Sequence, residues 1–593
     1  MWDWVVVGAN AGGTPALPRD VSLSSRSETV RRSLRWGHLM KNSPRPALVS
    51  LTLALSLAVA AHADVTPAPL FTDHAVLQRD KPVPVWGTAD VGEKVIVMFA
   101  SQTHEATTGY DGRWIVFFDP LAMSALGSDL HIVGKNTITL HDVVVGEVWL
   151  CSGQSNMEWP VMRASNAEAE IAAANFPLIR HVRIERAVAE TPVDTVRTSG
   201  WQPASSRTVG AFTAVGYFFA RDLHQKLGAR ASGPQGSPEA GETPALPGVP
   251  IGIINSSWGG TPVESWMSPA ALAQDPAFAV VHERWRQSVA EFPARKIDYE
   301  TRFASWMKSD AEAKLVVGPK AETALRGKSA MRIDPMTIYN DWLRQNPRPR
   351  APRGRGDPWT PAGLFNGMIN PLLPYTLRGA LWYQGESNAE RASEYQALFG
   401  AMITAWRSHF AQGDFPFYWV SLANYGVPTD GNEKGRTYAF LREAQTKTLE
   451  LPNTGQALAI DIGDPTDIHP TNKQEVGRRL ALLARNRIYG IIGDDTGPTF
   501  ASATREGAAM RVRYTHASGG LVAHDKPVQS LELAGIDRVF YPADGRIDRD
   551  TLIVMSFSVR EPIAVRYAWT NAPEANLYNG AGLPAVPFRS DDW

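Results

Sequence analysis

Residues 146–160 read GEVWLCSGQSNMEWP, an apolar run that ends at the only cysteine of the chain, Cys151, and then breaks into small and amide residues. A short apolar run bounded by turn residues is typical of a buried strand. The Ser-Gly-Gln-Ser-Asn segment after it predicts a turn, which would expose Ser155 at the end of the strand. A serine in this position is either a helix N-cap or a nucleophile, and the stretch alone does not favour one over the other. Cys151 ends the apolar run, so we expect it to be buried and unreactive.

Further apolar runs resemble this strand, and helical patterns lie between or after them. The runs are GIINSSW (252–258), GALWYQ (379–384), FYWVSL (417–422) and ALAIDI (457–462). Apolar residues keep helical spacing over 213–228 and 471–489. Strands that alternate with helices predict an α/β core, in which a parallel sheet is covered on both faces and carries its functional loops at the carboxyl ends of the strands.

The 593-residue chain is long enough for roughly three or more domains. Residues 65–145 and 495–593 alternate apolar and polar positions between turn residues, which predicts a β domain at each end of the core. Residues 267–360 interrupt the core with tryptophan-rich helical stretches and a Pro/Arg run. We interpret them as an insertion that divides the core into 146–266 and 361–492.

The N-terminal residues predict export. Residues 40–63 have a basic start, an apolar run and small residues at the end, which is the pattern of a secretory signal peptide cut before Asp64. The apolar run is too short for a stable membrane anchor. Met40 is a plausible start of this signal peptide. We therefore interpret residues 1–39 as an extension that results from a mis-assigned upstream start codon. The sequence therefore predicts a periplasmic or secreted bacterial protein.

Composition excludes several classes of protein. A hydrophobic fraction of 44% and a charged fraction of 20% are typical of a folded chain. The formal net charge of -1 gives no indication of a nucleic-acid partner. One cysteine allows no internal disulfide. No His, Cys and acidic residues have the spacing of metal ligands, so we expect neither a metal nor a cofactor.

The strongest candidate for a general base is His469. It lies in DIGDPTDIHPTNKQEVGRRLALLA (461–484), after the last predicted core strand and before a helix. Asp467 and Asp464 precede it in the same loop, and a carboxylate there is able to orient the imidazole and stabilise its cation. The chain order Ser155, Asp467, His469 suits a hydrolase whose acid and base share one loop.

Two more predicted strands end in loops that offer hydrogen-bond donors. NSSWGGTPVESW (255–266) contains Gly259, whose backbone N–H is open to close approach, although a glycine pair is also typical of a tight turn. WYQGESN (382–388) contains Gln384, a side-chain amide donor. Backbone and amide donors aimed at one point are what a tetrahedral oxyanion requires.

Four blocks, GQSNMEW (153–159), SWGGTPVESW (257–266), WYQGESN and DIHPTNKQEVGRRLA (467–481), together resemble the sialate O-acetylesterase family of the SGNH hydrolases. The resemblance extends from about residue 65 to the end of the chain. It implies a three-layer α/β/α SGNH core with a parallel sheet, interrupted by the insertion and flanked by the two β domains. It also implies a carbohydrate O-acetylesterase that needs no cofactor.

Carried over to this sequence, the resemblance implies Ser155 as nucleophile and His469 as base. It also implies an oxyanion hole made of the Ser155 and Gly259 N–H groups and the Gln384 amide. Most SGNH hydrolases place the acid three residues before the histidine, where this chain has threonine. Asp467 is therefore the first candidate for the acid and Asp464 the second, and a Ser–His dyad steadied by a backbone carbonyl stays open.

The implied reaction is release of acetate from an acetylated carbohydrate through an acetyl-serine intermediate. The substrate is either a plant cell-wall polysaccharide or oligosaccharide, such as xyloglucan or xylan, or O-acetylated sialic acid. The main alternative is a non-catalytic secreted carbohydrate-binding protein on a dead hydrolase scaffold. A glycosidase that uses two carboxylates among Glu158, Glu264 and Glu386 is a further alternative, but it leaves Ser155 and His469 unexplained.

Overall fold

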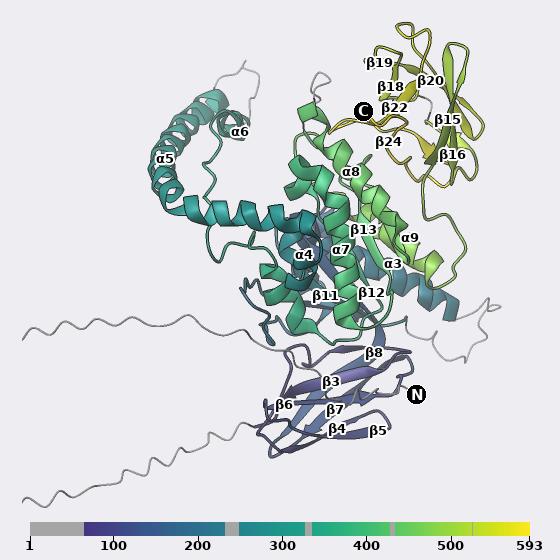
Figure 1. The fold of residues 1–593 in the computed structure, drawn as a ribbon. Helices are drawn as coiled ribbons and strands as arrows, with labels where there is room; N and C mark the ends of the chain where they lie inside the picture. The colour runs from purple at the N-terminus through teal and green to yellow at the C-terminus, as the bar shows by residue number, and fades with distance from the viewer. Residues whose placement is uncertain (1–63, 232–247, 327–334, 427–432, 525) are drawn as a thin grey trace, which may run out of the picture. The chain divides into compact units, whose positions relative to one another are not determined.

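The computed structural model describes residues 64–593 except 232–247, 327–334, 427–432 and 525 (Figure 1). The predicted signal peptide and N-terminal extension lie outside the described residues. Among the residues that are described, no helix combines the length and the apolar character that crossing a membrane requires.

The centre of the fold is a sheet of parallel strands, in the order β9-β11-β8-β12-β13-β14, with β10 antiparallel at its edge. Side chains of the inner strands are buried along their whole length, because helices cover both faces of the sheet. The bounds are β8 Thr137–Gly153, β9 Asn175–Arg183, β10 Gln202–Ser205, β11 Ile251–Ser257, β12 Gly379–Tyr383, β13 Phe417–Val420 and β14 Thr454–Ala457.

The structure confirms the predicted strands around 147–151, 252–258, 379–384 and 417–422, but it corrects the last one. The apolar run 457–462 is not the strand itself, because β14 ends at Ala457. The rest of the run is buried without pairing in the sheet, since Leu458, Ala459 and Ile460 are nearly inaccessible to solvent. The sequence does not predict β9 or the edge strand β10.

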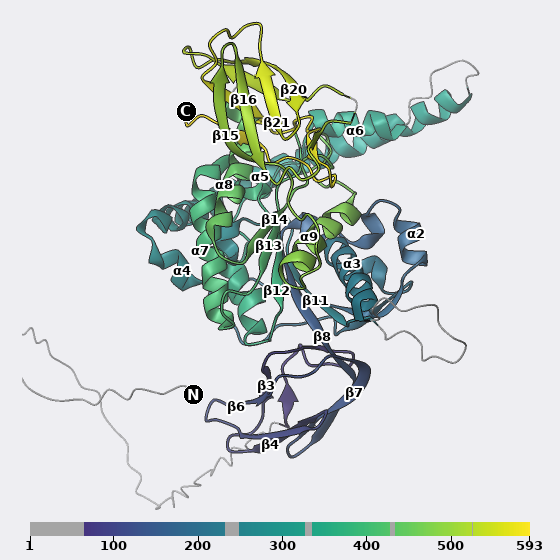
Figure 2. The same cartoon turned by 90° about the vertical axis from the view of Figure 1, so that its right-hand side faces the viewer.

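Helices α3 (Ala214–Ala231) and α9 (Lys473–Arg487) pack together on one face of the sheet, and α7 (Ala392–Phe410) and α8 (Thr437–Lys447) pack on the other (Figure 2). Alternation along β12 explains this division. Trp382 joins the core beneath α7, whereas Tyr383 joins the core beneath α3 and α9. The helices predicted over 213–228 and 471–489 are confirmed.

The strands of the N-terminal β region connect directly to the core. The first half of β8 pairs with β7, and its second half pairs with β11 and β12. The predicted boundary at 145/146 therefore lies inside one continuous strand. The other strands are β1 Thr66–Pro67, β2 Val76–Gln78, β3 Val83–Thr88, β4 Lys94–Phe99, β5 Gln102–Thr107, β6 Arg113–Phe118 and β7 Ser124–Val133.

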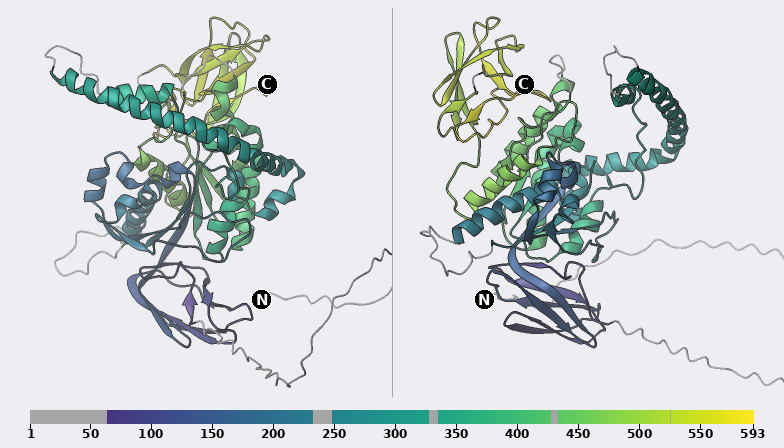
Figure 3. Two further views of the ribbon diagram at one scale, coloured as in Figure 1. Left: turned by 90° about the vertical axis from the view of Figure 1, so that its left-hand side faces the viewer. Right: turned by 180° about the vertical axis from the view of Figure 1, so that it is seen from behind.

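The interrupting segment is helical, as predicted. Helix α5 (Ala279–Arg326) is a single long helix, and α6 (Pro335–Gln345) lies beside it (Figure 3). The indole of Trp306 donates a hydrogen bond to the carbonyl of Asn346 and packs against Trp342. These contacts between α5 and α6 account for two of the tryptophans of this segment, Trp306 and Trp342.

Residues after 495 form three small sheets around their own apolar core. Arg442 of α8 joins this region to the core, because its buried guanidinium donates hydrogen bonds to the carbonyls of Thr570 and Asn571. The strands are β15 Thr499–Glu506, β16 Ala509–Thr515, β17 Leu521–Val522, β18 Leu531–Ala534, β19 Phe540–Pro542, β20 Asp544–Asp548, β21 Thr551–Met555, β22 Ala564–Tyr567, β23 Tyr578–Asn579 and β24 Phe588–Arg589.

The remaining described helices are short, and most lie in the loops at the strand ends. They are α1 Ser155–Glu158, η1 Val161–Arg163, α2 Ala167–Ala172, η2 Val209–Ala211, η3 Val263–Trp266, α4 Pro269–Gln274, η4 Pro276–Phe278, η5 Phe365–Ile369, η6 Asn370–Leu372, η7 Glu386–Arg391, η8 Glu433–Arg436 and η9 Thr448–Glu450.

Candidate active site

The carboxyl ends of β8 and β14 bring a serine and a histidine together. Ser155 follows β8 as the first residue of α1, and His469 lies in the loop between β14 and α9. The Oγ of Ser155 is 2.9 Å from the Nε2 of His469. Two predicted residues that are far apart in the sequence are therefore in hydrogen-bond contact.

The turn before Ser155 requires its glycine. Gly153 has a φ of +127°, and a Cβ at this position would lie 2.3 Å from the carbonyl oxygen of Tyr383. The N-cap of α1 is Gln154 and no side chain caps the helix, so the interpretation of Ser155 as an N-cap is wrong. Cys151 is buried as expected, and burial raises the pKa of its thiol.

The surroundings of the His469 imidazole favour its neutral form. It stacks on the indole of Trp159, with ring centroids 4.8 Å apart. Burial lowers its pKa below the ordinary value of 6.5, and the charges of Lys473 and Arg163 act in the same direction, while Asp467 opposes them. A neutral imidazole is able to accept the Ser155 hydroxyl proton at Nε2.

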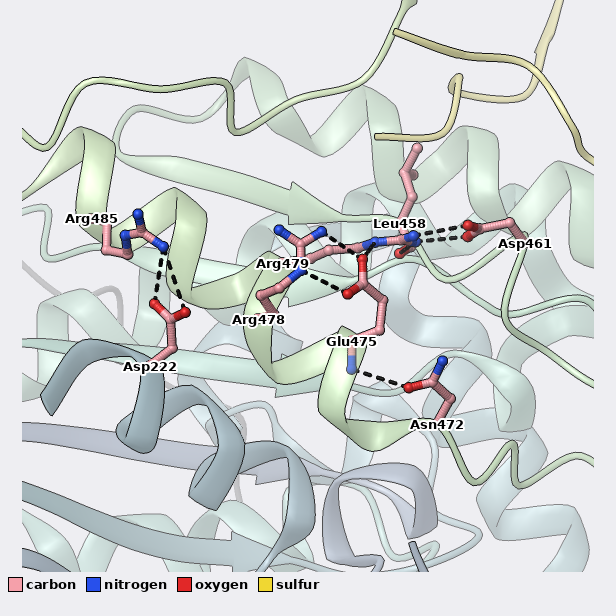
Figure 4. Close-up of polar contacts among 8 residues, drawn as sticks. All are labelled: Asp222, Leu458, Asp461, Asn472, Glu475, Arg478, Arg479 and Arg485. Atoms are coloured by element: carbon pink, nitrogen blue, oxygen red, sulfur yellow. Dashed lines mark hydrogen bonds and ion pairs between the residues drawn. The ribbon is translucent and has the colours of Figure 1, made fainter. Parts of the chain in front are cut away.

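The loop that carries His469 is anchored at both ends (Figure 4). At its start, Asp461 makes a two-point ion pair with Arg479 of α9, at 2.7 and 2.8 Å. At its end, the side chain of Asn472 caps α9 by accepting the backbone N–H of Glu475. Anchoring of this kind holds the imidazole in one place before any substrate arrives.

The two candidate acids differ in what they contact. One carboxylate oxygen of Asp467 accepts the backbone N–H of His469 at 2.8 Å and lies 3.7 Å from the imidazole Nδ1. That distance is an ion-pair contact and is too long for a hydrogen bond. Asp464 accepts the backbone N–H and the hydroxyl of Thr466, at 2.7 and 2.8 Å. Of the two, Asp467 is therefore the carboxylate placed to act on the imidazole.

Gly259 lies directly against the serine. A Cβ at Gly259 would be 3.1 Å from the Cβ of Ser155. Its backbone N–H donates to one carboxylate oxygen of Glu158 at 3.0 Å, and the other oxygen of Glu158 pairs with Arg186. The predicted donor is thus next to Ser155, but in this structure Glu158 accepts its hydrogen bond.

The structure contradicts the prediction for Gln384. Its side chain is fully buried, and its amide nitrogen donates to the Thr261 carbonyl at 3.1 Å and to the Asn388 side chain at 2.7 Å. Its amide oxygen accepts the hydroxyl of Tyr395 in α7. Strand alternation is the reason, because Gln384 faces the same side of the sheet as Trp382, towards α7. Both amide hydrogens are used within the protein, and none is left for an oxyanion.

The three glutamates of the glycosidase alternative all accept hydrogen bonds from protein groups. Glu158 accepts from the Gly259 N–H and from Arg186. Glu264 accepts from Asn388 and Arg391, and Glu386 accepts from Asn156.

Sequence reasoning missed two buried residues beside the Ser–His pair, Asn156 and Lys473. Asn156 donates to the carbonyl of Ile468 at 3.0 Å and accepts the Nζ of Lys473 at 2.6 Å. A lysine at the start of a helix is usually exposed, so the sequence contains no local signal that this one is buried.

The end of the inserted segment borders the site. The indole N–H of Trp359 donates to the carbonyl of Gly260 at 2.7 Å. The guanidinium of Arg353 lies over the Trp359 ring, and both residues line a cavity of about 220 Å³ together with Glu264 and Arg391. Trp359 therefore contacts both this cavity and the turn that contains Gly259.

Comparisons with known proteins find carbohydrate esterases. Residues 359–485 match the family of carbohydrate esterases described as sialic acid-specific acetylesterases. The sialate O-acetylesterase of Rattus norvegicus is 28% identical over 92% of this chain and 98% of the relative, and that of Homo sapiens is 25% identical over 85% and 88%. The crystal structure of a novel carbohydrate acetylesterase from Xanthomonas citri is 34% identical, covers 89% of this chain and 100% of its own, and superposes with a TM-score of 0.69.

Proposed function

Since this chain belongs to the sialate O-acetylesterase family of carbohydrate esterases and is an esterase hydrolase, we propose that it removes acetyl groups from carbohydrates through an acetyl-serine intermediate on Ser155. The observation that carries the proposal is the 2.9 Å contact between Ser155 Oγ and His469 Nε2. A serine hydroxyl is a weak nucleophile until a neighbouring base removes its proton, and His469 is that base.

The proposed reaction has two halves. His469 accepts the Ser155 proton while Oγ attacks the acetyl carbonyl, and the imidazolium then gives the proton to the departing sugar alcohol. In the second half, His469 removes a proton from water, the hydroxide attacks the acetyl-serine, and acetate leaves as Ser155 regains its proton. The backbone N–H of Ser155 stabilises both oxyanions, joined by that of Gly259 once the carboxylate of Glu158 has withdrawn.

We assign the core to the three-layer SGNH hydrolase fold. The support is that α3 and α9 cover one face of the sheet, and α7 and α8 cover the other. In this proposal the β domains 65–145 and 495–593 flank a core of 146–266 and 361–492, which the insertion 267–360 divides. The signal-peptide pattern of residues 40–63 supports a periplasmic or secreted bacterial enzyme.

The proposed substrate is an acetylated plant cell-wall polysaccharide or oligosaccharide, such as xylan or xyloglucan, or O-acetylated sialic acid. The test is to incubate the purified protein with acetylated sialic acid, xylan, xyloglucan and pectin, and to rank acetate release. A serine-directed phosphonate should block that release and label Ser155. If no substrate yields acetate and the phosphonate does not react, the protein is the non-catalytic carbohydrate-binding alternative.

We expect kcat/KM to rise with pH along a single acid limb whose midpoint lies below 6.5. A general base works in its neutral form, and burial together with Lys473 and Arg163 lowers the pKa of His469. Activity should therefore be lost only as the pH falls through this lowered pKa, and it should be fully present at about pH 7. Rates of acetate release measured from about pH 4.5 to about pH 8 test this. A midpoint above 6.5 would contradict it.

Replacing Asp467 with asparagine should lower kcat by about 5- to 30-fold, because a largely exposed carboxylate some 4 Å from the imidazolium is worth about 1 to 2 kcal/mol. The asparagine keeps an oxygen for the His469 N–H, so the loss reports charge rather than loop structure. Removing this charge should also move the acid limb to lower pH, since Asp467 raises the pKa of His469.

Asp464→Asn is the matched control, and kcat should change by less than about threefold, because the Asp464 carboxylate contacts Thr466 and not the imidazole. A larger loss in Asp464→Asn than in Asp467→Asn would reverse the assignment. No loss in either variant would favour the Ser–His dyad.

A further inference from the structure

Lys473 is buried directly behind the Ser–His pair. It is the first residue of α9, its side chain is inaccessible to solvent, and its Nζ donates to the Asn156 side-chain oxygen at 2.6 Å. The Nζ also lies 5.3 Å from the ring centroid of Tyr383. Among the described residues, no carboxylate is within ion-pair distance of it. A buried ammonium without a direct counterion is costly, so its position calls for an explanation.

Burial lowers the pKa of Lys473 to about 7, and the charges of Glu386 and Asp467 oppose that shift. Glu386 is linked to the lysine through Asn156. One of its oxygens accepts the Asn156 amide nitrogen at 2.7 Å. Its other oxygen is buried and has no hydrogen-bond partner among the residues that the structure describes. Burial raises the pKa of Glu386, and the charge of Lys473 opposes that rise. Lysine, amide and carboxylate thus form one chain, in which the Asn156 side chain has a single possible orientation.

Asn156 contacts both segments that carry the reacting groups. It directly follows Ser155, and its amide nitrogen also donates to the carbonyl of Ile468, the residue before His469, at 3.0 Å. One side chain therefore joins the turn after β8 to the loop after β14. Glu386 extends the contact to the loop after β12.

We propose that Asn156, held in one orientation by Lys473 and Glu386, is the positioning residue that keeps Ser155 Oγ within hydrogen-bond distance of His469 Nε2. This proposal rests on the proposed esterase function and adds to it three residues that touch neither the substrate nor the transferred proton. Positioning of this kind matters because a shift of about 1 Å between reacting groups costs about 100-fold in rate.

The principal test is Asn156→Leu, which keeps the branched shape and the number of side-chain heavy atoms but makes none of these hydrogen bonds. We expect kcat for acetate release to fall by about 100-fold with KM changed less than about threefold, because the Asn156 side chain is buried and is not available to bind substrate. The rate at which a serine-directed phosphonate labels Ser155 should fall in parallel. Wild-type kcat and labelling in a folded Asn156→Leu protein would overturn the proposal.

Glu386 supplies a conservative pair of variants. Glu386→Gln keeps an oxygen for the Asn156 amide and should retain most of kcat, whereas Glu386→Leu removes the acceptor and should lose about as much as Asn156→Leu. Equal rates in the two Glu386 variants would overturn the proposal even if Asn156→Leu does not fold.

Lys473→Met adds a readout that a purely structural role would not affect. Because the Lys473 charge lowers the pKa of His469, its removal should move the acid limb of kcat/KM to higher pH while kcat falls. The matched control is Lys81→Met, which removes a half-buried lysine whose Nζ donates to the Leu377 carbonyl, and it should leave both the acid limb and kcat unchanged.

The wild-type protein distinguishes the two proposals. If it releases acetate and is labelled at Ser155 while the variants behave like it, the positioning role is wrong and the esterase mechanism stands. If the wild-type protein neither releases acetate nor is labelled at Ser155, the esterase mechanism is wrong, and the positioning role is then wrong as well.

Discussion

Ser155→Ala is expected to lower kcat for acetate release by about 10,000-fold or more, with little change in stability to heat. Loss of the nucleophile in a serine hydrolase leaves only the rate that binding and oxyanion stabilisation provide. The Ser155 side chain contacts His469 at the carboxyl end of the sheet, and a methyl group fits the same space. Acetate release should be measured beside a thermal unfolding curve.

Ser152→Ala is the matched control, three residues earlier, near the end of β8. The Ser152 hydroxyl is buried and has no hydrogen-bond partner among the described residues, so its loss should leave kcat unchanged. Retention of more than about a tenth of the activity in Ser155→Ala would exclude Ser155 as the nucleophile, since a true nucleophile contributes far more.

His469→Ala is expected to lower kcat by a similar factor, because without a base the Ser155 hydroxyl keeps its proton. Removal of the ring also leaves a gap beside Trp159, on which the imidazole stacks. Added imidazole should fill that gap and restore part of the rate. If His469 only supported the loop, His469→Ala would lose little kcat, and added imidazole would not raise it.

The control for this variant is His181→Gln, since His181 also stacks on an aromatic ring, with its centroid 4.4 Å from that of Phe212. It lies in β9, away from the serine, so kcat per folded molecule should not change. A loss as large as that of His469→Ala would show that disturbance of the sheet, and not of the base, explains the result.

Much of the fold could be predicted because strand periodicity is a local property. The apolar runs that became β8, β11, β12 and β13 are buried on both faces, and that burial is visible in sequence as unbroken apolar stretches. The last strand was predicted over 457–462, but β14 ends at Ala457. The apolar residues directly after it do not pair in the sheet, and an apolar run does not reveal this. The boundary at 145/146 could not be seen, since one long strand serves both sides of it.

The sequence by itself determined most of the strands that end at one edge of the sheet, and it indicated Ser155, His469 and Asp467 as candidate catalytic residues at these ends, with Asp464 as the alternative acid. Strand ends, turns and caps depend on near neighbours in the chain, and so they can be read from it. The tertiary structure alone decided which polar groups are free to act. Gln384 donates both amide hydrogens inside the protein, Gly259 donates to Glu158, and Asn156 joins two loops. Each of these groups finds a partner that is remote in sequence, and the choice of partner depends on burial and distance, which local patterns do not contain.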